Sequence, residues 1–206
     1  MGSIWNVIGI IAWIILIGWF VFIVQNVRKR HLKMIVVDKK KFSWSGAIID
    51  IAEIAVLLAG FIFMVTVTFF NRVDVNDSQR VEISYSYKPL VVQTNGYTGY
   101  FVQKKAFDKA SFDEYTFWQT NAKYKVSSKN AVVIDDEKDL KTTINNYPWD
   151  KKALLKANKD NQGAFVAKMK GTYKNNFLNG LGMHAGKKAN EYWVIKIPAS
   201  NFVKEK

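Results

Sequence analysis

The sequence predicts a membrane-anchored α+β protein: a two-helix transmembrane hairpin followed by an extracytoplasmic α+β domain with an antiparallel sheet. Three observations lead to this fold class. Two long apolar runs lie near the start of the chain, at 4–24 and 46–70. The connection between them, 25–45, holds seven basic residues and one acidic residue. The mixed sequence that follows, 71–206, is long enough for one domain with its own core.

The first apolar run is predicted to be a transmembrane helix. It has no charged residue, and its length corresponds to about 31 Å of helix, close to the thickness of a hydrocarbon core. A cleaved signal peptide would carry its positive charge before the apolar run. Here residues 1–3 carry no charged side chain, and Arg28 follows the run. We therefore expect an anchor at 4–24, preceded by a short external N-terminus.

The charged connection predicts the orientation of the hairpin. Cytoplasmic loops of membrane proteins carry an excess of Lys and Arg, and anionic lipid attracts these side chains to the inner leaflet. We therefore expect the connection to face the cytoplasm and both termini to be extracytoplasmic, in a cell membrane crossed by two spans. The basic residues expected to contact the inner leaflet are Arg28, Lys29, Arg30, Lys33, Lys39, Lys40 and Lys41.

The second apolar run, 46–70, contains two carboxylates near its cytoplasmic boundary, Asp50 and Glu53. One interpretation places them in the headgroup zone, paired with lysines of the connection, because unpaired charge in lipid is costly. The other makes them a polar contact to another membrane protein. On the opposite face lies a stripe of small residues suited to packing against the first helix, which would direct the carboxylates toward lipid or a partner. The stripe comprises Ala52, Ala55, Ala59 and Thr66.

The charged connection also carries a family resemblance. The stretch QNVRKRHLKMIV, followed by KKFSW, resembles the opening of a family of small two-span membrane proteins from lactic acid bacteria. The resemblance covers mainly residues 1–70. It implies a Gram-positive cell membrane, and it implies no mechanism, because the family has no assigned activity.

Composition limits the chemistry of the region after residue 70. This region holds 23 basic and 14 acidic residues, which favours an anionic envelope polymer, lipid headgroups or an acidic protein as its partner. A lysine-rich surface that serves only solubility is the alternative. Nucleic acid is not expected outside the cell. The chain has no cysteine, which excludes disulfides, thiolate zinc sites and thiol nucleophiles.

The extracytoplasmic domain is predicted at 81–206, after a short polar stalk at 71–80. Alternation of apolar and polar residues predicts strands, Asn95-Gly96 predicts a hairpin turn, and Ser111 and Glu114 fit a capping box that begins a helix. An acidic cluster at 135–139 is expected to begin another helix, with a calcium site as the alternative. The expected elements are strands at 81–88, 90–94, 97–103 and 131–134 and helices from 111 and at 149–158.

The last third of the chain predicts two paired strands. Residues 165–173 and 193–197 alternate apolar and polar side chains, which is typical of an antiparallel sheet with one solvated face. If the strands pair, Lys168, Lys170 and Lys196 would form an exposed basic patch.

The connection between these strands, 175–190, contains Gly180, Gly182, Lys187 and Lys188, a composition that can wrap an anion with backbone N–H groups. A flexible surface loop is the alternative reading. His184 lies in the same connection, but no nucleophile motif accompanies it.

These observations predict a membrane-anchored extracytoplasmic binding protein of the cell envelope whose basic domain contacts an anionic cell-wall polymer, lipid headgroups or a protein. The alternative is an accessory subunit of a membrane complex, contacted through Asp50, Glu53 and the alanines. An exported hydrolase using His184 is the weaker third reading, so no enzyme activity is expected. No cofactor or metal is expected.

Overall fold

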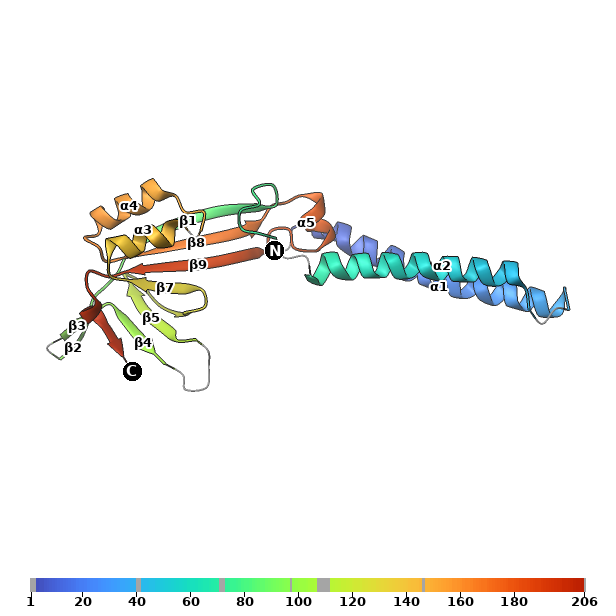
Figure 1. The fold of residues 1–206 in the computed structure, drawn as a ribbon, viewed down its shortest axis with the longest axis horizontal. Coiled ribbons are helices and arrows are strands. Elements are labelled where there is room, and N and C mark those ends of the chain that lie inside the picture. The colour runs from blue at the N-terminus through green and yellow to red at the C-terminus, as the bar shows by residue number, and fades with distance from the viewer. Residues whose placement is uncertain are drawn as a thin grey trace. The chain divides into compact units, whose positions relative to one another are not determined.

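The computed structural model describes residues 3–39, 42–70, 73–96, 98–106, 112–145 and 147–205. Two compact units make up the chain (Figure 1). The helical unit comprises Met1–Asp74 together with Tyr173–Lys187. The sheet unit comprises Val75–Thr172 together with Lys188–Lys206. The segment 173–187 therefore belongs to the helical unit, although it lies in sequence between two strands of the sheet unit.

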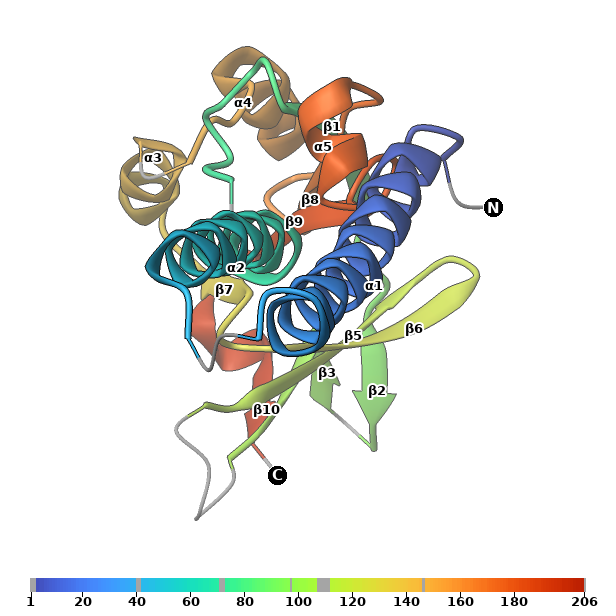
Figure 2. The same cartoon turned by 90° about the vertical axis from the view of Figure 1, so that its right-hand side faces the viewer.

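The helical unit contains the predicted pair of long apolar helices. Helix α1 is Asn6–Val36, and helix α2 is Trp44–Val65, continued by a π-helical turn, η1, at Thr66–Phe70. Both are long and apolar enough to cross a membrane, and only 11% of the most apolar stretch of each is buried. That low burial distinguishes them from the core helices of a soluble protein. The two helices lie side by side (Figure 2).

Helix α1 continues well beyond the predicted span of 4–24. It runs through the basic residues Arg28 and Lys33 to Val36, because residues 25–36 contain neither Gly nor Pro and are rich in good helix formers. Much of the expected connection is therefore helical. Helix α2 begins at a capping residue, Ser43, whose side chain accepts a hydrogen bond from the backbone N–H of Gly46.

The packing between α1 and α2 differs from the prediction. The alanine stripe was expected to face α1, but Ala52, Ala55 and Ala59 are exposed. The face of α2 that packs against α1 instead recurs every three or four residues, through Asp50, Glu53, Leu57, Gly60 and Met64. This spacing is the seam of a left-handed helix pair. Charge pairing near the turn selects this face over the alanines.

Three layers form the sheet unit (Figure 1). The central sheet has the strand order β1-β8-β9-β7. Strands β8 and β9 are antiparallel, and β7 is parallel to β9. Two helices, α3 and α4, cover one face of this sheet. The strands are β1 (Val81–Pro89), β7 (Ala131–Ile134), β8 (Phe165–Tyr173) and β9 (Lys188–Lys196), and the helices are α3 (Glu137–Asn145) and α4 (Lys151–Asp160).

A second sheet, in the order β10-β4-β5-β6, covers the other face of the central sheet. A short hairpin, β2–β3, turns at Gly96, where φ is +69°. The short helical turn η2 (Ser200–Phe202) precedes the last strand. These strands are β2 (Gln93–Asn95), β3 (Thr98–Tyr100), β4 (Val102–Lys105), β5 (Glu114–Gln119), β6 (Ala122–Ser127) and β10 (Val203–Glu205).

Most predicted elements are confirmed: the strands at 81–88 and 131–134, the hairpin around Asn95-Gly96, the helix after Pro148 and the antiparallel pair in the last third. The predicted helix after the capping box is wrong. Ser111 lies outside the described residues, and Glu114 begins strand β5. Phe117 and Tyr115, two residues apart, both pack into the core between the two sheets, as side chains on one face of a strand do.

The predicted solvated face of the central sheet is also wrong. One core contains Phe165, Ala167 and Met169 and lies under the helices. The other contains Val166 and Ile195 and lies under the second sheet. Val75 packs against the first of these cores, and Asn71 and Arg72 of the predicted stalk lie outside the described residues.

Candidate functional site

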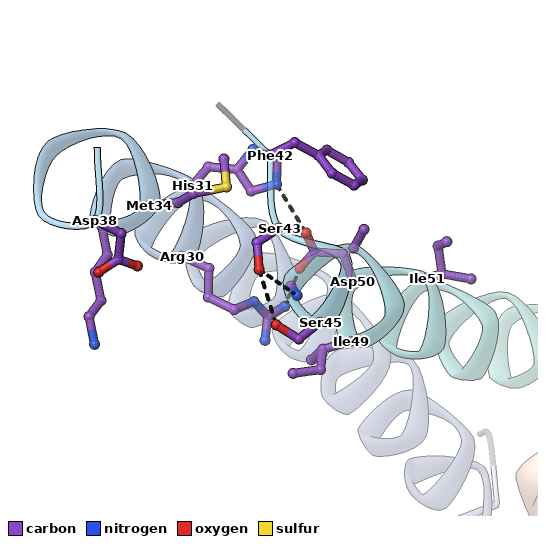
Figure 3. Close-up of a pocket in the computed structure, with 13 residues that line it drawn as sticks. Arg30, His31, Met34, Asp38, Phe42, Ser43, Ser45, Ile49, Asp50 and Ile51 are labelled. Carbon is purple, nitrogen blue, oxygen red and sulfur yellow. Dashed lines mark hydrogen bonds and ion pairs between the residues drawn. The ribbon is translucent and has the colours of Figure 1, made fainter. Parts of the chain in front are cut away.

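The two ends of the helical unit hold its polar contacts. We call the end at the α1–α2 connection the basic end. Here a network joins the helices, which we call the Arg30 network: Asn26, Arg30 and His31 on α1, with Asp50 and Glu53 on α2 (Figure 3 shows Arg30, His31 and Asp50).

Arg30 is the centre of this network. Its guanidinium donates to Asp50 Oδ1 at 2.5 Å and to both oxygens of Glu53, at 2.9 Å and 2.6 Å. Asn26 Nδ2 donates to Glu53 Oε1 at 3.1 Å, and His31 Nε2 lies 3.0 Å from Asp50 Oδ2. A planar guanidinium can serve two carboxylates at once in a way that an ammonium group cannot. One cation thus holds both acidic groups of α2.

The carboxylates therefore face α1 and pair with a cation of the connection, as the first interpretation predicted, although this cation is Arg30 and not a lysine. The alternative, in which they point away from α1, is wrong. The physical reason is the cost of unpaired charge in apolar surroundings. The partner was readable from the sequence, because Arg30 and Asp50 are nearly equidistant from the turn around residue 40 and meet when the chain folds back. Their use for an outside partner would require displacing Arg30. The other residues predicted to contact a membrane partner, Ala52, Ala55 and Ala59, lie on the exposed face of α2.

A cavity of about 430 Å³ lies beside the Arg30 network, between the end of α1 and the start of α2 (Figure 3). Arg30, His31 and Asp50 line one part of it, and Met34 and Phe42 line another. The exposed basic residues Arg28, Lys29, Lys33 and Lys39 lie at the same end of the helix pair. Lys40 and Lys41, also predicted to contact the inner leaflet, lie outside the described residues.

The other end of the helical unit is closed by the segment 173–187, which we call the end cap. It contains the short helix α5 (Phe177–Leu181). Asn6 Nδ2 of α1 donates to Ala185 O at 3.0 Å. Asn179 is fully buried and donates through Nδ2 to Lys174 O at 2.9 Å. A buried amide with a partner fixes the cap in one conformation.

Glycines allow the end cap to meet the helices backbone to backbone. A Cβ added at Gly180 would lie 2.4 Å from Trp5 O, and one added at Gly9 would lie 2.5 Å from Leu181 O. At Gly182 it would lie 2.8 Å from Val67 O. These distances are too short for any side chain, so glycine is required at all three positions.

This arrangement bears on the predicted anion loop. The N–H of Gly180 donates to Asn176 O, and the N–H of Gly182 donates to Leu178 O, so both groups already have partners within the cap. Lys187 and Lys188 are exposed. His184 stacks on Tyr173, with ring centroids 5.2 Å apart. The structure therefore gives the glycines a packing role that spacing alone did not reveal.

The predicted basic patch on β8 and β9 is only partly assembled. Lys170 is exposed, whereas Lys168 pairs with Glu191 at 3.3 Å and lies over the Trp193 ring. Lys196 is not on an exposed face: it is only 5% exposed and its Nζ donates to Asp135 O and Ile197 O. Burial lowers the pKa of Lys196, although the nearby acidic residues oppose this shift.

The acidic cluster at 135–139 lies at the start of helix α3, as the first of its two interpretations predicted. Asp136 Oδ1 accepts the backbone N–H of Lys138 at 2.9 Å, and Glu137 and Asp139 lie in the first turn. Among the described residues no group of three or more potential metal ligands comes together.

Comparison with known proteins gives a family and no activity. No curated protein and no solved structure matches the chain. The model of one protein family, an uncharacterised family named after a locus of a lactic acid bacterium, matches residues 4–204. The match extends through both units, beyond the first 70 residues that suggested the resemblance. The chain therefore belongs to this uncharacterised family.

Proposed function

We propose that this protein is a membrane-anchored binding protein of the cell envelope. The helical unit spans the membrane with its basic end in the cytoplasm, and the sheet unit binds an anionic envelope component outside. The observation that carries this proposal is the helix pair itself: two adjacent helices whose apolar side chains point outward, with basic residues gathered at one end.

The outward apolar surface supports insertion into lipid. Ile14 and Phe22 of α1 are each 62% exposed, and Ile51 and Ile62 of α2 are similarly exposed. A continuous apolar surface of this length exceeds what monomeric soluble proteins expose. Both helices satisfy their backbone hydrogen bonds internally, as lipid requires.

Charge at the basic end supports the orientation. Arg30 is committed to Asp50 and Glu53, so the two acids are compensated within the helix pair. The exposed residues Arg28, Lys29 and Lys33 remain to contact anionic headgroups on the cytoplasmic side.

The end cap suits the outer membrane interface. Phe177 and Leu178 of α5 are 57% and 55% exposed. The helix that carries them lies against the start of α1, where Trp5 is also partly exposed. Aromatic and apolar side chains at the ends of membrane-spanning helices anchor proteins at the boundary between the headgroups and the hydrocarbon core.

Single cysteines test the orientation, because the natural chain has none. Lys170→Cys lies on the sheet unit and Lys39→Cys at the basic end, and both positions are exposed. A membrane-impermeant maleimide should label Lys170→Cys on intact cells and Lys39→Cys only after permeabilisation. The reverse pattern would overturn the proposed function.

A second function is favoured by one observation: Ala52, Ala55 and Ala59 form an exposed strip along α2 that fits close helix packing. Under this proposal the protein is an accessory subunit of a membrane complex. Co-purification of a membrane partner that survives deletion of the sheet unit, and is lost when the three alanines become Leu, would support it.

A further inference from the structure

Four residues of the sheet unit form a continuous row of rings and cations, which we call the aromatic–lysine row. Lys204 Nζ lies 5.3 Å from the ring centroid of Tyr100. The Tyr100 and Trp118 rings meet edge to face with centroids 5.8 Å apart. Lys123 Nζ lies 5.4 Å from the Trp118 ring. The four residues come from β10, β3, β5 and β6, so no sequence motif brings them together.

The strand register directs this row away from the core. Phe117 of β5 stands opposite Tyr124 of β6, and both pack into the core between the two sheets. The next pair along, Trp118 and Lys123, points to the other face because side chains alternate. Lys123 is exposed, and Tyr100 and Trp118 are partly exposed.

The two lysines of the row differ from their neighbours in charge pairing. Lys125 of β6 lies 3.4 Å from Glu114, and Lys104 of β4 lies 3.4 Å from Asp113. Within the part of the chain that the structure describes, Lys123 and Lys204 have no carboxylate within ion-pair distance. An ammonium group has three N–H donors, and contact with one ring occupies only one side of the group. Both lysines therefore keep donors for an anionic ligand.

A row in which two rings lie between two cations fits a ligand whose C–H-rich units lie between anionic groups. Ring faces carry partial negative charge and favour the C–H groups of sugars and polyols. Ammonium groups bind phosphate oxygens as point charges. A simple anion would need the lysines alone, and a neutral glycan would need the rings alone.

We propose that the aromatic–lysine row, formed by the second sheet together with Tyr100 of the β2–β3 hairpin, binds a polymer of sugar or polyol units joined by phosphodiesters. Tyr100 and Trp118 stack on the sugar or polyol units, and Lys123 and Lys204 hold the phosphates. The inference rests on the proposed function, since it requires the sheet unit to lie outside the cell, where it would meet such a polymer.

Poly(glycerol phosphate) binding to the full-length protein in detergent tests the row. Lys123→Gln and Lys204→Gln should each weaken binding by about tenfold, since each removes one charge-assisted contact. Trp118→Leu should weaken it by a similar factor. Lys156→Gln is the matched control, because it removes an exposed lysine on α4, away from the second sheet, and should change affinity by less than about twofold.

The other outcomes separate the row from the wider proposal. If Lys156→Gln weakens binding as much as Lys123→Gln, the sheet unit binds through its overall charge; the row is then overturned and the proposed function stands. If Trp118→Leu binds normally and inorganic polyphosphate binds equally well, the rings have no role and the row is overturned. If phosphatidylglycerol vesicles bind and the polymer does not, the partner is lipid and the polymer proposal fails.

Discussion

The helical unit and the sheet unit are built with opposite polarity. In the sheet unit, apolar side chains such as Phe117, Phe165 and Ile195 are buried and the lysines lie mainly outside. In the helical unit, many large apolar side chains face outward, and the contact between the helices includes Arg30, its acidic partners and Gly60 beside the buried Ile23 and Met64. Each unit hides what its surroundings solvate poorly, so the inversion argues for two different solvents.

The largest difference between the two units should appear when the same kind of side chain is truncated in each. Phe117→Ala, at a fully buried position, should lower the free energy of unfolding of the sheet unit by about 3–5 kcal/mol. Phe22→Ala on the exposed face of α1 should leave the stability of both units nearly unchanged. Urea titration of the full-length protein in detergent, followed by tryptophan fluorescence, measures both. Equal losses would contradict the inversion.

The glycine contacts at the end cap should give the next largest effect. Gly180→Ala places a Cβ against Trp5 O and should destabilise the docked cap by about 1–3 kcal/mol. Trypsin cleavage at Lys174 and Lys187, which are exposed at the two ends of the cap, should then become faster. Gly18→Ala, where nothing lies within 4 Å, is the control and should leave the cleavage rate unchanged. Unchanged cleavage in Gly180→Ala would exclude the close packing.

Arg30 tests whether charge holds the helices at the basic end. Arg30→Gln leaves Asp50 and Glu53 without their shared cation and should loosen the helix pair. Distance measurements between probes on α1 and α2 during titration with a denaturing detergent would report this. Arg28→Gln, an exposed neighbour on the same helix, should have no such effect. In Arg30→Gln/Glu53→Gln the two losses should be less than additive, and full additivity would contradict a direct pair.

The smallest expected effect is a pH dependence in the sheet unit. Burial alone would raise the pKa of Glu191, but Lys168, the indole N–H of Trp193 and Lys188 outweigh it and lower that pKa. Because this pKa is lower in the folded protein, the unfolded chain binds more protons as the pH falls. The stabilisation that ionised Glu191 gives the folded state is therefore fully present above about pH 4.3, the ordinary pKa of Glu, and is lost as the pH falls further. In Glu191→Gln, the free energy of unfolding should therefore fall less steeply with decreasing pH than in the natural protein. Identical acid-unfolding curves for the two proteins would contradict this prediction.

The sequence predicted the elements whose signals are local. Apolar length was sufficient for α1 and α2, alternation for β8 and β9, and Asn95-Gly96 for the hairpin. It failed where the deciding contact is distant. The strand at Phe117 depends on a core formed with Val102 and Trp193, whereas the local spacing suggested a helix.

The candidate sites likewise depend on contacts between residues that are distant in the sequence. Asp50 and Glu53 were predicted to pair with lysines of the connection, but the cation that holds them is Arg30 on the other helix. Gly180 and Gly182 suggested an anion loop because their neighbours in sequence are lysines, whereas their neighbours in space are backbone oxygens of Trp5 and Val67. No local sequence signal indicates the aromatic–lysine row, because its four residues come from four separate strands.

The central claim is that the outward face of the helix pair lies in lipid. Spin labels at Ile14→Cys and Lys170→Cys, in protein reconstituted into bilayers, measure this directly through collision with oxygen, which partitions into lipid, and with a water-soluble nickel complex. If this face lies in lipid, oxygen should relax the label at residue 14 and the nickel complex should not, with the opposite result at residue 170. Equal access of the nickel complex to both labels would contradict it.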